Sequence, residues 1–374
     1  MARSDQGWSY VGTTPTVIGL EKAKGSRAAG IYLLGAVPSE AVSLATPPRL
    51  VASGPDLEAV SYLACSSGPE PCLYAASSSA KGGTGARGRL SAWKLDPGTG
   101  AVTGIGAIES PGAGVAHLAL SRTGHYLLAA DYGRGSVFTH PLLADGSVGP
   151  LASEVVHAGG GPIGARQGTP HPHMVAVDSE TGIVLVPDLG ADRVFAYELD
   201  EERGTLGALS ENTVTLPPGS GPRHLAFMYG RGLALLTNEL AGTVALLVRD
   251  REGGYSVSDI VPSTSQRGVT NAPSGVRVSG DGQLAYVANR GPNSISVFRT
   301  DGSCLEAVQE VACGGDWPRD LVVDHQDGIL LVANHRSHDV TVLRLTDSGL
   351  PQEPAGSWRV DCPNCLVIAD VELG

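Results

Sequence analysis

One pattern of apolar runs and glycine turns recurs along this chain, and it constrains the fold more than any other feature. Each copy has a short apolar run, a polar turn with glycine, and a second apolar run ending in Asn or Asp. Such pairs predict antiparallel hairpins. A third apolar run follows each hairpin, as in SISVFRT and DVTVLRL. Clear copies of the hairpin are PHMVAVDSETGIVLVPDL, PRHLAFMYGRGLALLTNEL, PSGVRVSGDGQLAYVANR and PRDLVVDHQDGILLVANH.

The spacing of the copies sets the size of the repeating unit. If the last apolar residue of each first strand is taken as a marker, successive markers lie 45 to 57 residues apart. This length fits four strands and their loops, which is the period of a β-propeller blade. The markers are Cys65, Leu120, Val177, Phe227, Val278, Val323 and Ile368.

The two ends of the chain predict how the ring closes. The last unit, CPNCLVIAD, supplies only a first strand, whereas WSYVGTTPT and GIYLLGAV near the N-terminus resemble second and third strands. We therefore expect the two ends to build the seventh blade together, which leaves no open sheet edge. The sequence predicts an all-β fold, a seven-bladed β-propeller forming a single domain over residues 1–374.

Charge and hydropathy exclude several classes of partner. The net charge of −12 argues against a nucleic-acid partner, because backbone phosphates require a basic surface. The chain has no run of 18 apolar residues and no N-terminal signal pattern, so we expect no membrane partner. These features predict a cytoplasmic protein whose six cysteines stay reduced.

Two short motifs resemble cofactor or metal sites, but their context argues against that function. Cys362 and Cys365 have zinc-like spacing, yet no second Cys/His pair lies nearby and the motif opens a strand. The stretch GTGARG matches a dinucleotide-binding pattern but precedes the strand-like RLSAWKL, so it lacks the helix that would bind phosphate and is expected to be a loop. No G-x-S-x-G nucleophile motif is present. We expect neither a cofactor nor a metal.

The repeat also predicts which residues meet at one end of the central channel. The start of each first strand and the end of each second strand lie at the same end, because the two strands are antiparallel. Repeated residues at these positions are expected to be structural: proline suits a strand opening, and Asx side chains hold turns. They are Pro172, Pro222, Pro273, Pro318 and Pro363, with Asp131, Asp188, Asn238, Asn289 and Asn334.

The residues beside these prolines and Asx residues vary from blade to blade, which indicates function carried on a regular scaffold. Arginines gathered on one rim of an acidic protein repel one another unless an anion neutralises them. We predict that four of these residues are catalytic: His173, Arg223, Glu239 and Arg290. Residues at equivalent positions, or in the loop before His173, are predicted to bind substrate: Arg166, Gln167, His171, Arg319, His335 and Tyr132.

The motifs that carry these residues resemble one known family. RQGTPHPHMVAVD, VPDLGADRVFAYELD, GPRHLAF, TNELAGTV and YVANRGPNSISVF are similar to the lactonase family of seven-bladed propellers. That family includes bacterial-type 6-phosphogluconolactonases and fungal carboxy-cis,cis-muconate cyclases. The resemblance covers most of the chain and is strongest over residues 166–345. The resemblance implies that the site histidine of the cyclase branch corresponds to His173, its glutamate to Glu239 and its arginines to Arg223 and Arg290.

The leading hypothesis is hydrolysis of a sugar lactone such as 6-phosphogluconolactone, a small anionic substrate. Water would attack the ring carbonyl with Glu239 or His173 as general base, and the sequence does not distinguish the two. The arginines would stabilise the oxyanion and bind the phosphate or carboxylate.

Three alternatives remain open. The same residues could form a lactone from a carboxymuconate-type diacid, or a non-catalytic propeller could bind an anion or peptide. A calcium-assisted lactonase could use oxygen ligands, although the neighbouring arginines would repel the cation. Those ligands would be Asp188, Asn238, Asn289 and Glu239.

Overall fold

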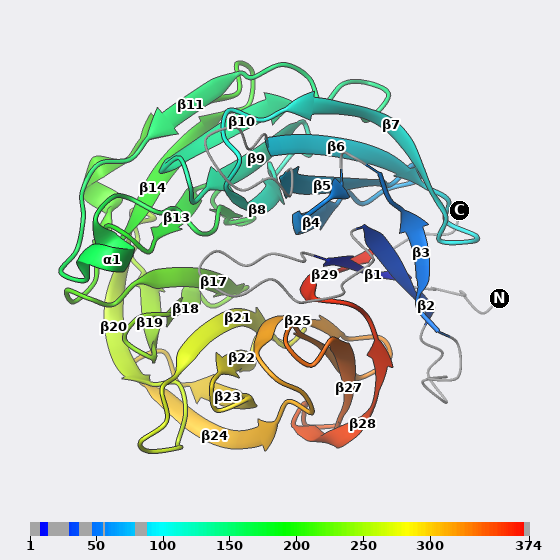
Figure 1. Ribbon diagram of the computed structural model, residues 1–374. Coiled ribbons are helices and arrows are strands. Elements are labelled where there is room, and N and C mark those ends of the chain that lie inside the picture. Colours follow the sequence, from blue (N-terminus) through cyan, green and yellow to red (C-terminus); the bar gives the residue numbers. More distant parts are fainter. Residues whose placement is uncertain (1–7, 14–29, 37–46, 55–56, 79–87, 370–374) are drawn as a thin grey trace.

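The computed structural model describes residues 8–13, 30–36, 47–54, 57–78 and 88–369. The chain forms seven antiparallel sheets arranged in a ring (Figure 1), which confirms the predicted seven-bladed β-propeller. The predicted GTGARG loop begins at Gly83 and lies largely outside the described residues, while Gly88 begins a strand.

The blades are numbered here in chain order, with the strand nearest the channel first. Blade 1 comprises β4 (Val60–Cys65), β5 (Cys72–Ser78), β6 (Gly88–Leu95) and β7 (Val102–Glu109). Blade 2 comprises β8 (Val115–Leu120), β9 (Tyr126–Asp131), β10 (Ser136–Pro141) and β11 (Ser153–Val156). Blade 3 comprises β12 (Ala176–Val177), β13 (Val184–Asp188), β14 (Arg193–Asp200), β15 (Thr205–Ala208) and the short β16 (Val214–Thr215).

The remaining blades follow the same plan. Blade 4 comprises β17 (Pro222–Met228), β18 (Leu233–Asn238), β19 (Thr243–Arg249) and β20 (Tyr255–Pro262). Blade 5 comprises β21 (Ala272–Val278), β22 (Leu284–Arg290), β23 (Ser294–Thr300) and β24 (Leu305–Ala312). Blade 6 comprises β25 (Pro318–Asp324), β26 (Ile329–Asn334), β27 (Asp339–Leu345) and β28 (Pro351–Arg359). The helical elements that the structure describes are α1 (Gly164–Gln167) and the 3-10 turn η2 (Ser210–Asn212).

Blade 7 joins the two ends of the chain, as the sequence predicted. Its inner strand, β29 (Pro363–Ala369), pairs with β1 (Trp8–Thr13), which is followed by β2 (Ile31–Ala36) and β3 (Arg49–Ala52). The β1 and β29 strands are antiparallel along nearly their whole length (Figure 1). No described strand follows β29 along the chain, and β1 takes the place of the second strand of its blade. The inner strand of blade 7 is therefore paired like those of the other blades.

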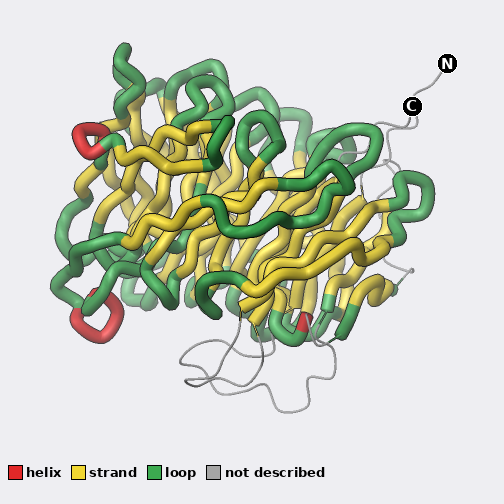
Figure 2. The backbone as a smooth tube through the Cα atoms, turned by 90° about the horizontal axis from the view of Figure 1, so that it is seen from above, coloured by secondary structure: helices red, strands yellow, loops and turns green. Residues whose placement is uncertain are grey.

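The core lies between neighbouring blades, since each sheet packs a face against the next. The second strand of a blade is buried on both faces, and every residue of β9, β18, β22 and β26 is buried. Leu331 and Val342 of blade 6, for example, share a cluster with Val11 and Leu34 of blade 7. Viewed at right angles to Figure 1, the strands fill the body and loops connect them at its surface (Figure 2). No helix among the described residues is long and apolar enough to cross a membrane.

The repeated prolines and Asx residues face each other across the first two strands. Pro222 pairs with Asn238, and the equivalent pairs are Pro172–Asp188, Pro273–Asn289 and Pro318–Asn334. The register shifts immediately after the proline in blades 4, 5 and 6. Such bulges re-aim side chains and are common beside active sites. In blades 4 and 6 the bulge falls on Arg223 and Arg319, to which the sequence analysis assigned function.

Candidate active site

Glu239 is the centre of the candidate site, and it lies one residue beyond the end of β18. Its side chain is only 7 % exposed and is surrounded by three arginines from three parts of the chain. Arg166 Nη2 donates to Oε1 at 2.7 Å. Arg290 Nη2 lies 2.7 Å from Oε2, and Arg223 Nε lies 3.0 Å from the same oxygen. Three predicted site residues, Arg166, Arg223 and Arg290, therefore contact the Glu239 carboxylate directly.

The arginines keep Glu239 ionised. Burial alone would raise the pKa of this carboxyl, but the charges of Arg290, Arg223 and Arg166 outweigh burial and hold the pKa well below its usual range. Both oxygens are occupied by guanidinium groups, so the carboxylate acts as a counter-ion for the cluster. With both oxygens engaged, neither is free to take a proton from an attacking water, so Glu239 is poorly placed to act as a general base.

Positive charge remains in excess around Glu239. Burial, followed by repulsion from Arg290, lowers the pKa of Arg223 to about 9, and burial with the same neighbour lowers that of Arg319 to about 10. Both side chains still carry charge at neutral pH. Arg223 Nη1 and Arg319 Nε are buried and have no hydrogen-bond partner among the described residues. Unpaired buried guanidinium N–H groups favour an anionic ligand.

Backbone contacts fix the orientation of Arg290 at the end of β22. Its Nε donates to the carbonyl of Ala272 at 2.8 Å, and Nη2 approaches the carbonyl of Pro273 at 3.4 Å. Arg290 is buried, with the ring of Trp317 5.6 Å from its Cζ. The guanidinium is therefore held in place before any ligand binds, which favours electrostatic stabilisation of a developing charge.

His173 lies on the same rim with an uncommitted imidazole. Burial, followed by the charge of Arg223, lowers its pKa well below the usual value, so the ring is neutral at pH 7. Its Nδ1 is buried without a hydrogen-bond partner among the described residues. The residue as a whole is partly exposed, and its main-chain N–H donates to Pro187. A neutral imidazole without a fixed partner can accept a proton.

Two of the predicted substrate-binding residues form an aromatic wall beside His173. Tyr132 stacks on His171 with ring centroids 4.3 Å apart, and it meets His173 edge-on at 5.6 Å. The Nδ1 atom of His171 donates to the main-chain carbonyl of Tyr132 at 2.7 Å. His171 therefore braces the end of β9 against the loop that carries His173.

The short helix α1 brings Arg166 to the site, and its neighbour Gln167 holds the helix in place. Arg166 is 43 % exposed, so it is the most accessible of the arginines around Glu239. Gln167 is buried, and its amide donates to the carbonyl of Leu189 and to Asp192. The predicted substrate contact of Gln167 gains no support from this geometry; its contacts instead fix the loop that presents Arg166.

His335 and Arg319 occupy the blade 6 side of the rim. Burial, followed by the charge of Arg319, lowers the pKa of His335 to about 3, and its Nδ1 donates weakly to the carbonyl of Pro363 at 3.4 Å. The charges of Arg290 and Glu239 both act on the Arg319 guanidinium and shift its pKa in opposite directions. Arg319 thus shares the positive field of the site, whereas His335 remains a neutral side chain beside it.

The structure adds a second group of polar residues that the sequence analysis missed. Tyr62, His117 and His224, from the inner strands of blades 1, 2 and 4, form ring contacts, and His224 also meets His173 at 5.2 Å. Arg277 pairs with Asp320 at 2.9 Å beside them. A signal in the sequence exists for most of them, because Tyr62, His117, His224 and Asp320 each stand two residues after the start of an inner strand. The bulge near the strand opening brings this position inward beside the first variable residue.

The predicted structural role of the Asx residues is confirmed by their contacts. Asp188 Oδ1 accepts from the main-chain N–H groups of His171, Gly190 and Ala191. Asn289 joins Ser263 through its side-chain oxygen and amide. In the part of the chain that the structure describes, no group of three or more His, Cys, Asp or Glu side chains is arranged to hold a metal ion. Of the proposed calcium ligands, Asp188 and Asn289 are committed to these contacts and Glu239 to arginines.

Cys362 and Cys365 are both buried, as expected from their position at the start of a strand. All six cysteines lie among the described residues, and none of them forms a disulfide. Cys362 lies 3.4 Å from His338 Nδ1, but the same nitrogen accepts the main-chain N–H of Cys362. The CPNC stretch is thus a packed strand opening in this structure.

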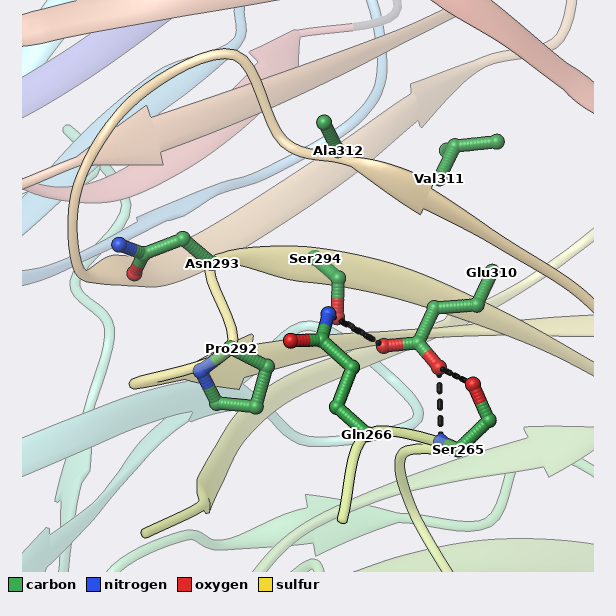
Figure 3. A pocket seen from close by; sticks show the side chains of 8 residues that line it. All are labelled: Ser265, Gln266, Pro292, Asn293, Ser294, Glu310, Val311 and Ala312. Atoms are coloured by element: carbon green, nitrogen blue, oxygen red, sulfur yellow. Dashed lines mark hydrogen bonds between the residues drawn. The ribbon is translucent and has the colours of Figure 1, made fainter. Parts of the chain in front are cut away.

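A cavity of about 220 Å³ lies away from Glu239, at the outer strand of blade 5 (Figure 3). Its only charged lining group is Glu310, which accepts hydrogen bonds from Ser265, Ser294 and Thr264. All these donors are neutral, so they satisfy the hydrogen bonding of the carboxylate but bring no positive charge that could bind an anion. We therefore place the candidate site at Glu239 and treat Glu310 as a link between neighbouring loops and strands.

Comparison with known proteins agrees with the geometry. A family model described as "Lactonase, 7-bladed beta-propeller" matches residues 10–368. A 6-phosphogluconolactonase of Bacillus subtilis is 31 % identical over 261 residues, covering 68 % of this chain and 73 % of that protein. A 6-phosphogluconolactonase of Formosa agariphila is 27 % identical, covering 71 % of this chain and 78 % of that protein.

Solved structures support the same relationship. The periplasmic gluconolactonase of Pseudomonas aeruginosa has a TM-score of 0.83 at 26 % identity, covering 97 % of this chain and 99 % of that chain. A protein from Lactobacillus plantarum has a TM-score of 0.84 at 26 % identity, with the same coverage. With its ring of seven blades and a family match over almost its whole length, the chain belongs to the lactonase family of seven-bladed β-propellers.

Proposed function

We propose that this protein hydrolyses a sugar lactone with an anionic group, such as 6-phosphogluconolactone, at the rim around Glu239. The observation that carries the proposal is the arrangement of Arg166, Arg223 and Arg290 about one carboxylate, next to a neutral His173. The names of the relatives support the lactone substrate, and two of them are 6-phosphogluconolactonases.

In this proposal His173 is the general base. Both Glu239 oxygens are engaged by guanidinium groups, whereas His173 Nδ1 has no partner among the described residues. His173 takes a proton from water as the water oxygen bonds to the lactone carbonyl carbon. The ring C–O bond then breaks, and the departing alkoxide receives the proton from His173. Glu239 sets the positions of the arginines and balances part of their charge.

The arginines supply the two electrostatic functions that the reaction needs. A fixed guanidinium close to the carbonyl oxygen stabilises the oxyanion of the tetrahedral intermediate. Arg290 suits this role because backbone carbonyls hold it in place. Arg223 and Arg319 have unpaired N–H groups that would bind the phosphate or carboxylate of the substrate. The same rim could bind the polycarboxylate of a cycloisomerase, but the names of the two curated relatives cited above support the lactonase.

The test measures acid release from 6-phosphogluconolactone, with correction for spontaneous hydrolysis, in the parent protein and in His173→Gln. The parent should accelerate ring opening, and His173→Gln should lose about a hundredfold or more in turnover. A parallel assay follows carboxymuconate absorbance in the ultraviolet. Loss of that absorbance without lactone opening would replace the proposal with the cycloisomerase, and inactivity on both would favour a non-catalytic propeller.

A further inference from the structure

Trp317, which no part of the mechanism above uses, has an unusual backbone conformation. It lies immediately before β25 and has φ of +65°. Left-handed backbone is costly for a bulky side chain, because the Cβ atom crowds the neighbouring peptide groups. Conformations of this kind persist where the surroundings enforce them, and they cluster at functional sites.

The propeller itself provides an internal comparison for this position. Gly221 and Cys362 stand before the opening prolines of β17 and β29, and they also have positive φ, of +61° and +47°. The entry into the inner strand thus requires left-handed backbone in several blades. Glycine adopts it without steric cost. The backbone of blade 6 therefore gives no reason for a tryptophan at this position.

Hydrogen bonds hold the Trp317 backbone from both sides. Its N–H donates to Asn293 Oδ1 at 2.9 Å, and its carbonyl accepts from the N–H of His335 at 3.1 Å. The amide of Asn293 in turn donates to Asp316 at 2.8 Å. The indole is consequently fixed in direction through the main chain.

The indole lies against two guanidinium groups. Arg336 Cζ is 3.5 Å from the ring centroid, and Arg290 Cζ is 5.6 Å from it. The indole Nε1 is buried and has no hydrogen-bond partner among the described residues. The polar groups that contact the indole ring are the two guanidinium groups. An indole ring attracts guanidinium cations through its π face. Because Arg336 lies over the ring at contact distance, that face is not free to stack on a sugar.

We propose that Trp317 is a positioning residue that holds the Arg290 guanidinium in its orientation toward Glu239 and the substrate. The proposal rests on the proposed lactonase function of the rim. Backbone carbonyls fix Arg290 through Nε and Nη2, the carboxylate of Glu239 attracts Nη2, and Trp317 contributes a flat surface close to the guanidinium. Without the indole, the guanidinium keeps its charge but loses part of its fixed geometry.

Trp317→Phe keeps an aromatic ring at this position, whereas Trp317→Leu keeps only an apolar side chain. Both substitutions retain the same backbone strain, so comparing them isolates the contribution of the aromatic ring. With 6-phosphogluconolactone as substrate, Trp317→Leu should lower kcat/KM about tenfold, with most of the loss in kcat. Trp317→Phe should stay within about threefold of the parent. Equal losses in the two variants, or no loss in Trp317→Leu, would overturn the proposal.

Glycine at the same position provides a readout that a purely structural role would not give. Trp317→Gly relieves the left-handed strain while removing the indole, so kcat should fall about tenfold with little change in the urea midpoint. The matched control is Cys362→Gly, the same change at the equivalent position of blade 7, which should retain parental kcat. A fall of the urea midpoint in Trp317→Gly with unchanged kcat would overturn the proposal.

A measurement without substrate keeps this inference separate from the lactonase proposal. A double-mutant cycle combines Trp317→Leu with Arg290→Met, and urea unfolding is measured for all four proteins. If the indole holds Arg290, the two changes are coupled and their effects are not additive. Additive effects would overturn the positioning role whatever the substrate is. A coupled cycle in a protein that opens no lactone would retain this inference and reject the proposed substrate.

Discussion

Glu239 and Glu310 are both carboxylates surrounded by donors, but the donors differ in charge. Glu310 accepts from serine and threonine hydroxyls and from the main-chain N–H of Ser265, all of them neutral. Glu239 is approached by three guanidinium groups. Neutral donors satisfy the hydrogen bonding of Glu310 and bring no positive charge to it. Three arginines around one carboxylate leave an excess of positive charge, which a substrate anion can neutralise. A carboxylate that is hydrogen-bonded only by neutral groups thus indicates a structural link. A carboxylate surrounded by more positive charge than it can neutralise indicates an anion-binding site.

The largest expected difference between Glu239 and Glu310 is in their contribution to catalysis. Glu239→Gln should lower kcat/KM for lactone opening by about a hundredfold or more, because the arginines lose the charge that positions them. Glu310→Gln, the matched change in blade 5, should leave kcat/KM within about twofold. Steady-state rates of acid release measure both. Equal losses in the two variants would remove the functional distinction between these carboxylates.

Glu310→Gln is instead expected to reduce stability. Burial would raise the pKa of Glu310, but hydrogen bonds from Ser265 and Ser294 outweigh it and lower the pKa. The amide of glutamine cannot accept at both positions, so the free energy of unfolding should fall by about 1–3 kcal/mol. Urea unfolding at pH 7 measures this loss. A stability equal to that of the parent would show that the hydrogen-bond cluster is dispensable.

Arg319 tests whether the excess positive charge binds substrate. Arg319→Met should raise KM for a phosphorylated lactone about tenfold with a smaller change in kcat, because a guanidinium–phosphate contact is lost. The control is Arg299→Met, which removes an exposed ion pair with Glu306 on the outer part of blade 5. That change should leave KM unaltered. A KM for Arg319→Met equal to the parental value would place the phosphate elsewhere.

The pH dependence of kcat/KM tests whether His173 is the general base, with Glu239 as counter-ion of the arginines. The base must be unprotonated, and burial lowers the pKa of His173 well below the usual 6.5. The acid limb of kcat/KM should therefore lie below pH 6.5, and the rate should be nearly flat from pH 7 to pH 6. An unshifted histidine would lose about threefold over the same interval. A limb at or above pH 6.5 would assign the base to another group.

The fold was predictable because its signal is local and repeated. Alternating apolar runs, glycine turns and the proline–Asx positions give strands and hairpins, and their period gives the blades. The predicted pairing of the chain ends in blade 7 followed from counting strands, and β1 and β29 confirm it. His117, His224 and the Arg277–Asp320 pair were missed because a bulge breaks the alternation on which inward and outward positions are assigned.

The sequence by itself determined the seven-bladed ring and the end of the channel where variable residues gather. It also marked His173, Arg223, Glu239 and Arg290 as members of one rim. Only the tertiary structure decided that the arginines share the carboxylate of Glu239, that Gln167 is committed to its own loop, and that Trp317 lies against Arg290. The physical reason is distance along the chain: local periodicity sets each strand, but contacts between residues tens of positions apart depend on how the ring closes.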